Sequence, residues 1–99
     1  MLRIADSAKN RIVDLCADFR RDKGVDAIPA IMWLDGDLND GRFPSGVLLG
    51  AYTAAQRDEV AHGIRISNGV EYVLAVSEHD LFKFLGKTLT FDGSLFHLE

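Results

Sequence analysis

The chain has 99 residues, of which 47% are hydrophobic and 26% charged, and its formal net charge at pH 7 is −4. This size predicts a single domain over residues 1–99 with a core large enough to fold without disulfides, and the single cysteine excludes an intramolecular one. The acidic balance argues against nucleic acid, which binds clustered lysine and arginine, and no apolar run nears the roughly 20 residues that span a bilayer.

Residues 1–4 are expected to form a short edge strand, and a long helix is expected at residues 7–23. Asp6 or Ser7 offers a side-chain acceptor for its first N–H groups, and Gly24 is typical of a helix end. Apolar residues recur at helical spacing and form one stripe: Ala8, Ile12, Leu15, Cys16 and Phe19. The N-terminal stretch LRIADS lacks the apolar segment of a signal peptide, so we expect a soluble cytoplasmic protein.

Two strands are expected next, at residues 28–34 and 47–52, with turn chemistry at residues 35–46 between them. The first is a nearly continuous apolar run, IPAIMWL, typical of a buried strand, in which Trp33 is expected to fill the core. Residues 53–62 are polar and fit either an irregular connection or a single helical turn.

Residues 63–98 predict two hairpins around a short helix. A three-residue loop at residues 67–69 is expected in the first hairpin, because it pairs Ile66 with Val70 and keeps the apolar side chains on one face. In the second, a two-residue Asp92-Gly93 turn pairs Leu89 with Phe96.

The short helix between the hairpins is expected at about residues 77–85. Ser77 caps it, and Leu81, Phe82 and Leu85 are expected to bury one side. Strands joined mostly by hairpins, with few helices, predict an α+β fold with a mixed or antiparallel sheet.

The element order, with the stretches PSGVLLG and GKTLTFDG, resembles the HesB/IscA-like fold of the A-type iron–sulfur carriers, and is most similar to its cysteine-poor members. The resemblance covers nearly the whole chain and implies a small mixed or antiparallel β sandwich or sheet. Where the carriers have their first cysteine this chain has Pro44, and their C-terminal Cys-x-Cys pair has no counterpart. Because thiolates hold an iron–sulfur cluster, the resemblance implies the fold without the cofactor or the chemistry.

The loop at residues 35–46 is the candidate interaction site. Its acidic spacing suggests an EF-hand, but Asp40 stands where that loop needs glycine and Gly46 where it needs glutamate, so turn chemistry is the better interpretation. Weak divalent binding remains an alternative. The residues expected to contact a protein partner are Asp35, Asp37, Asn39, Asp40, Arg42, Phe43, Pro44 and Ser45.

No catalytic or metal-binding set is predicted. Cys16 lies on the apolar stripe and is expected in the core. The three histidines, His62, His79 and His97, have no metal-ligand spacing. No function is assigned to Leu98 or Glu99, a pair that also fits a cloning remnant.

The sequence therefore predicts a non-catalytic HesB-like domain that contacts an unknown protein partner, as a monomer or a homodimer. Two alternatives stay open. One is a divergent iron–sulfur or metal carrier that uses Cys16 across a dimer. The other is a small-ligand binder or enzyme that uses the loop carboxylates and the histidines, which requires a pocket with at least two titratable groups.

Overall fold

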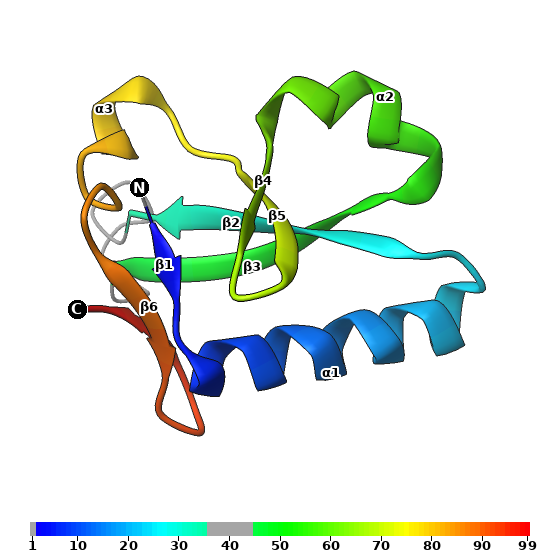
Figure 1. Cartoon of the computed structure of the whole chain (residues 1–99), viewed down its shortest axis with the longest axis horizontal. Coiled ribbons are helices and arrows are strands. Elements are labelled where there is room, and N and C mark those ends of the chain that lie inside the picture. The colour runs from blue at the N-terminus through cyan, green and yellow to red at the C-terminus, as the bar shows by residue number, and fades with distance from the viewer. Residues whose placement is uncertain (1, 36–44) are drawn as a thin grey trace.

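The computed structural model describes residues 2–35 and 45–99, which form seven strands and several helical segments (Figure 1). The strands are β1 (Arg3–Ile4), β2 (Ala27–Leu34), β3 (Gly46–Thr53), β4 (Ile64–Ser67), β5 (Val70–Leu74), β6 (Thr88–Phe91) and β7 (Phe96–Leu98). The helices are α1 (Asp6–Lys23), η2 (Ala54–Gln56), α2 (Arg57–Val60), η3 (Ala61–Gly63) and α3 (Glu78–Leu81). The helical segments between β3 and β4 occupy the stretch for which the sequence left two interpretations open.

The strands form two mixed sheets, so the predicted α+β class is confirmed. One sheet has the order β3-β2-β5-β4 and the other β1-β6-β7. The pairs β2–β5 and β1–β6 are parallel, and the other pairs are antiparallel. The helix α1 packs against β6 and β2, and therefore contacts both sheets. In Figure 1 it lies along one side of the molecule, with α2 and α3 on the opposite side.

The core lies where α1 meets the two sheets. Its side chains are Leu2, Ile4, Ala8, Ile12, Ile31, Val70, Tyr72, Phe84 and Leu89. The Tyr72 hydroxyl is buried and donates to the Leu2 carbonyl at 3.5 Å. Only the first half of the predicted apolar stripe on α1 is fully buried, because Leu15, Cys16 and Phe19 are half-exposed.

The predicted start of α1 is corrected in one respect, although its end is confirmed. Neither Asp6 nor Ser7 caps the helix, which follows Ala5 without a side-chain cap. The Asp6 carboxylate instead accepts from Asn68 Nδ2 at 2.7 Å, and the Ser7 hydroxyl accepts from the Phe91 N–H at 3.1 Å. Both acceptors thus bond segments distant in the sequence, the β4–β5 turn and β6, rather than the start of the helix. At the other end Gly24 takes φ 72° and donates to the Arg20 carbonyl.

The register of the β4–β5 hairpin differs from the predicted one. Ser67 pairs with Val70, and Ile66 with Glu71, so the turn contains two residues rather than three. Asn68 and Gly69 have φ values of 51° and 75°, as a type I′ turn requires. The one-residue shift turns Ile66 outward, where it is 70% exposed.

Tertiary hydrogen bonds explain why this turn prevails over the burial of Ile66. The Ser67 hydroxyl accepts from the Ile4 N–H at 3.0 Å. Asn68 Nδ2 donates to the Ile4 carbonyl at 3.1 Å. These two side chains bond the backbone N–H and C=O of Ile4 at the edge of β1, and they thereby join the two sheets.

The helix α3 is shorter than the predicted residues 77–85, and its apolar residues are arranged differently. Ser77 caps it as expected, accepting from the Asp80 N–H at 3.3 Å. Leu81, Phe82 and Leu85 are exposed, however, and Phe84 is the fully buried residue of this segment. Because α3 has four residues, the chain leaves the helical spacing before Phe84, and turns place that ring in the core.

The β6–β7 hairpin also differs from prediction, because Phe91 pairs with Phe96 and Leu89 with Leu98. Residues 92–95 form the loop, and Asp92 organises it. Its Oδ1 accepts from the backbone N–H groups of Ser94 and Leu95, both at 2.8 Å. Its Oδ2 lies 2.6 Å from Nε2 of His97.

Asp92 should make the stability of the protein depend on pH. The Leu95 N–H, His97 and the Ser94 N–H together lower the pKa of its carboxyl from 3.8 to about 2. A lowered carboxyl pKa contributes stability that is complete above about pH 4 and disappears as pH falls toward about 2. The melting temperature of Asp92→Ala should therefore lie below that of wild type at pH 6, with a gap that narrows between about pH 4 and 2. Asp14→Ala, at an exposed position of α1, is the control, and an equal narrowing there would contradict the assignment.

Candidate functional site

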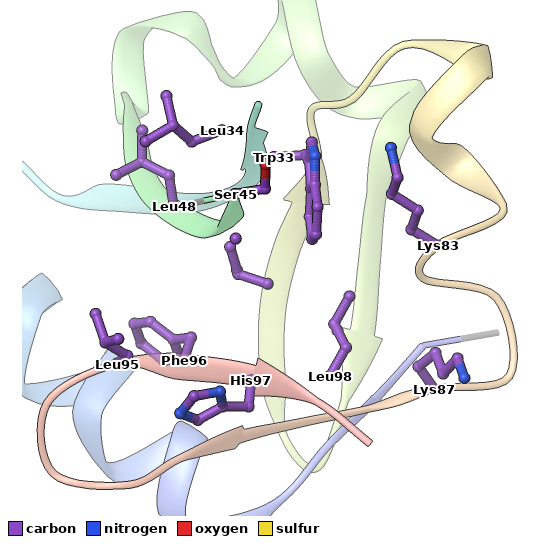
Figure 2. Close-up of a pocket in the computed structure, with 12 residues that line it drawn as sticks. Trp33, Leu34, Ser45, Leu48, Lys83, Lys87, Leu95, Phe96, His97 and Leu98 are labelled. Carbon is purple, nitrogen blue, oxygen red and sulfur yellow. The ribbon is translucent and has the colours of Figure 1, made fainter. Parts of the chain in front are cut away.

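A pocket of about 740 Å³ lies between the start of β3 and β7 (Figure 2). Residues 45–48 line one side and residues 95–98 the other. Trp33 and Leu34, at the end of β2, and two lysines, Lys83 and Lys87, complete the wall. We call this pocket the β3–β7 groove. Its volume is within the usual range of roughly 300–1,000 Å³ for ligand sites.

The groove faces the edges of two strands. Neighbouring side chains of a strand point to opposite faces, so a pocket lined by three consecutive strand residues lies beside the edge of the strand. Residues 46–48 of β3 and residues 96–98 of β7 line the groove in this way. Both β3 and β7 are also terminal strands of their sheets.

The hydrogen-bonding pattern shows which backbone groups face outward at β7. Thr88 and Glu99 exchange two backbone hydrogen bonds, so the alternation of an antiparallel ladder leaves the next pair, Leu89 and Leu98, without them. The same holds for Phe91 and Phe96. The N–H and C=O groups of Phe96 and Leu98 therefore point away from β6, and no bond to them occurs among the described residues.

The same alternation applies to β3. The Ala54 N–H donates to the Asp26 carbonyl at 3.0 Å, which sets the phase of the β2–β3 ladder. Bonded pairs recur every second residue as far as Met32 and Leu48, so the next pair, Trp33 and Val47, face each other without exchanging bonds. The backbone groups of Val47, which lines the groove, consequently point away from β2.

Trp33 packs against the core, as expected, but only in part, and it also forms part of the groove wall. Its indole is half-buried and rests edge-on against Phe84, with ring centroids 6.2 Å apart and an interplanar angle of 88°. The Nζ of Lys83 lies 4.9 Å from the centre of the indole ring. Trp33 is thus held by a perpendicular contact with Phe84 and has the Lys83 ammonium over its ring.

Two lysines stand at one end of the groove in Figure 2. Lys83 Nζ is paired with Asp80 Oδ1 at 2.5 Å, and this hydrogen bond lowers the pKa of the Asp80 carboxyl. The Lys87 side chain is exposed and makes no hydrogen bond or ion pair within residues 2–35 and 45–99, although its backbone bonds Arg3 and Phe84. Leu48 and Leu95 contribute apolar side chains to the rim of the groove, and these residues are 46% and 57% exposed.

The predicted interaction loop meets the groove at its described ends. Ser45 lines the groove, and Asp35 directly follows Leu34, which also lines it. The other predicted residues, and with them the calcium alternative, lie outside the described residues: Asp37, Asn39, Asp40, Arg42, Phe43 and Pro44.

The structure places Cys16 at the margin of the core rather than inside it. Its side chain is half-buried on α1, and this burial raises the pKa of the thiol. A raised pKa keeps the thiol protonated near neutral pH, which disfavours the thiolate needed for a metal site.

The histidines are exposed and occupy three different elements, His62 in η3, His79 in α3 and His97 in β7. Within the described part of the chain, no group of three or more His, Cys, Asp or Glu side chains is arranged to hold a metal ion. No described helix is long and apolar enough to cross a bilayer.

Sequence reasoning did not find Leu48, Lys87, Leu95 or Phe96 as candidate site residues. Each stands in an ordinary strand or turn context, and only the approach of β3 to β7 brings them together. The groove offers apolar contact, aromatic rings, free backbone edges and cations. This combination suits the recognition of a binding partner.

Comparison of the chain with protein-family models, with curated proteins and with solved structures finds no match.

Proposed function

We propose that this protein is a non-catalytic, cytoplasmic HesB-like domain that binds another protein through the β3–β7 groove. The observation that carries the proposal is an open apolar groove with Trp33 and Phe96 in its wall. Aromatic residues in partly desolvated pockets supply most of the energy in many protein interfaces. The unpaired edges of β3 and β7 add the groups that bond a partner's backbone.

The ionisable groups that the described residues bring to the groove favour binding over catalysis. Within residues 2–35 and 45–99, the ionisable side chains that line it are Lys83, Lys87 and His97. Lys83 and His97 are already bonded to Asp80 and Asp92, at 2.5 and 2.6 Å. An acid–base mechanism needs a pair of groups within reach of the same substrate atom, and these bonds occupy two of the three candidates.

One architectural feature is in keeping with the HesB-like part of the proposal, because the chain has one long helix near its N-terminus and two mixed sheets. A second feature supports the groove as the interaction site: Asp35 and Ser45, at the described ends of the candidate interaction loop, follow or line the groove wall. The net charge of −4 supports a partner other than nucleic acid.

The proposal predicts a protein partner whose retention depends on Leu95. Wild type, Leu95→Asp and Ile66→Asp would each be immobilised, and proteins retained from a lysate of the source cells quantified by mass spectrometry. Leu95 and Ile66 are both exposed, at 57% and 70%, but only Leu95 lines the groove. We expect at least one protein to be retained by wild type and Ile66→Asp, and about tenfold less by Leu95→Asp. If every retained protein binds the three forms equally, the groove is not the interaction site.

A further inference from the structure

We infer that the β3–β7 groove takes an extended segment of polypeptide that carries a bulky apolar side chain and, close to it, at least one carboxylate. The inference rests on the proposed function and specifies the chemistry of the partner.

The charges around the groove argue for an acidic partner. Its ionisable lining residues are basic, Lys83, Lys87 and His97, and no described Asp or Glu side chain lines it. The chain as a whole carries a net charge of −4. Asp80 pairs with Lys83 and Asp92 with His97, so Lys87 is the described lining cation whose charge is not compensated. An acidic segment is therefore repelled by much of the molecule and attracted here, which favours one docking position.

Lys87 is the cation of the groove that is most accessible to a carboxylate of a partner. The carboxylate of Asp80 pairs with Lys83, which also lies over Trp33, and the carboxylate of Asp92 pairs with His97. Among the described residues Lys87 has no such partner, and it is exposed. An incoming carboxylate can reach it without breaking an existing ion pair.

The apolar wall defines the second requirement. Trp33, Val47, Phe96 and Leu98 are half-buried, so each presents part of its apolar surface to the groove. A volume of about 740 Å³ has room for one large aliphatic or aromatic side chain and its neighbours. Burial of that side chain supplies affinity, and the lysine end of the groove fixes the direction of the segment.

The free backbone groups give the third requirement, an extended conformation. Phe96, Leu98 and Val47 direct N–H and C=O groups away from their paired strands. An extended segment leaves its own N–H and C=O groups available for such an edge, whereas a helix uses them internally.

The test is a selection of phage-displayed random dodecapeptides on the wild-type protein. We expect selected peptides to share an Asp or Glu within about four residues of Leu, Ile, Phe or Trp. The tightest peptide would then be labelled and its Kd measured by fluorescence anisotropy with wild type, Lys87→Glu, Leu95→Asp and Lys23→Glu. Lys23 is an exposed lysine at the end of α1, away from the groove, and is the matched control.

Lys87→Glu should weaken binding about tenfold and flatten its salt dependence, Leu95→Asp should weaken it at least as much, and Lys23→Glu should leave it unchanged. Two further peptides, N-methylated at alternate positions in the two possible phases, test the extended pairing. One phase should bind about tenfold more weakly than the other, because a strand edge uses every second residue.

Different results would overturn different statements. Peptides that lose affinity with Leu95→Asp but bind Lys87→Glu as well as wild type would refute the acidic chemistry and leave the proposed function standing. Equal binding of the two N-methylated peptides would refute the extended pairing. If no peptide depends on Leu95 while decanoate binds in a manner that does, the occupant is a small amphipathic anion, and both the inference and the proposed function are wrong.

Discussion

Replacement of Phe84 by alanine should lower the free energy of unfolding by about 3–5 kcal/mol. Phe84 is fully buried in the shared core, and its ring meets Trp33 edge-on. It is also the fully buried residue of the segment formed by α3 and the turns that follow it, in which Leu81, Phe82 and Leu85 are exposed. Removal of the ring leaves a cavity that the surrounding strands can fill only in part.

Phe82→Ala is the matched control for this prediction. The same chemical change occurs two residues away, at a side chain that is 64% exposed and whose ring has Lys83 Nζ 5.6 Å from its centre. Its cost should stay within about 0.5 kcal/mol. Urea unfolding followed by circular dichroism measures both variants. A similar loss for Phe82→Ala and Phe84→Ala would mean that the assignment of the buried ring is wrong.

The Phe84 variant should also disturb the groove, which makes the prediction relevant to function. Trp33 is the only tryptophan, so its fluorescence reports on the groove wall directly. Without Phe84 beneath it the indole gains contact with water, and its emission maximum should move to longer wavelength in native buffer. An unshifted emission would show that Trp33 is held by other contacts.

Regular elements of the fold were predictable where the periodic pattern was long enough to read. Eighteen residues of α1 and eight of β2 give many repeats of the helical or strand pattern, and both were found close to their actual bounds. The four-residue helix α3 provides a single turn, and there the spacing pointed to Phe82 instead of Phe84. With so little repetition, tertiary packing rather than local periodicity decides which ring is buried.

The groove was only partly predictable, because it forms between segments far apart in the chain. The turn-rich composition of residues 35–46 marked a region whose ends, Asp35 and Ser45, do lie beside the groove. The opposite wall comes from residues 95–98, and no local pattern signals that β7 approaches β3. Lys87 likewise could not be recognised as a site residue from the sequence, because only the folded chain places it beside the groove.

The predicted hairpin registers were wrong for a different reason, because they assumed that burial of apolar side chains alone determines the register. In the β4–β5 hairpin this assumption required Ile66 to face the core, yet Ile66 is 70% exposed. The turn is instead formed by Asn68 and Gly69, whose type I′ geometry matches the twist of the strands. Hydrogen bonds from this hairpin to β1 add a tertiary reason that the linear pattern does not contain.

Replacement of Asn68 by alanine should therefore lower the free energy of unfolding by about 2–3 kcal/mol. Asn68 has φ 51°, a conformation that costs alanine about 1–2 kcal/mol. Its Nδ2 also donates to the Ile4 carbonyl and to Asp6 Oδ1, at 3.1 and 2.7 Å. Loss of these two hydrogen bonds adds only about 1 kcal/mol to the destabilisation, because the bond to Asp6 is exposed and water can replace it.

Asn68→Gly separates the two contributions, because glycine accepts a positive φ without strain but loses the same side-chain bonds. It should cost about 1 kcal/mol, roughly half or less of the loss in Asn68→Ala. Urea unfolding at neutral pH gives both values. Equal costs would show that left-handed strain contributes nothing, and that the bonds to β1 alone set the register. A negligible cost for both would mean that neither the turn nor those bonds determine it, and that the exposed position of Ile66 has another cause.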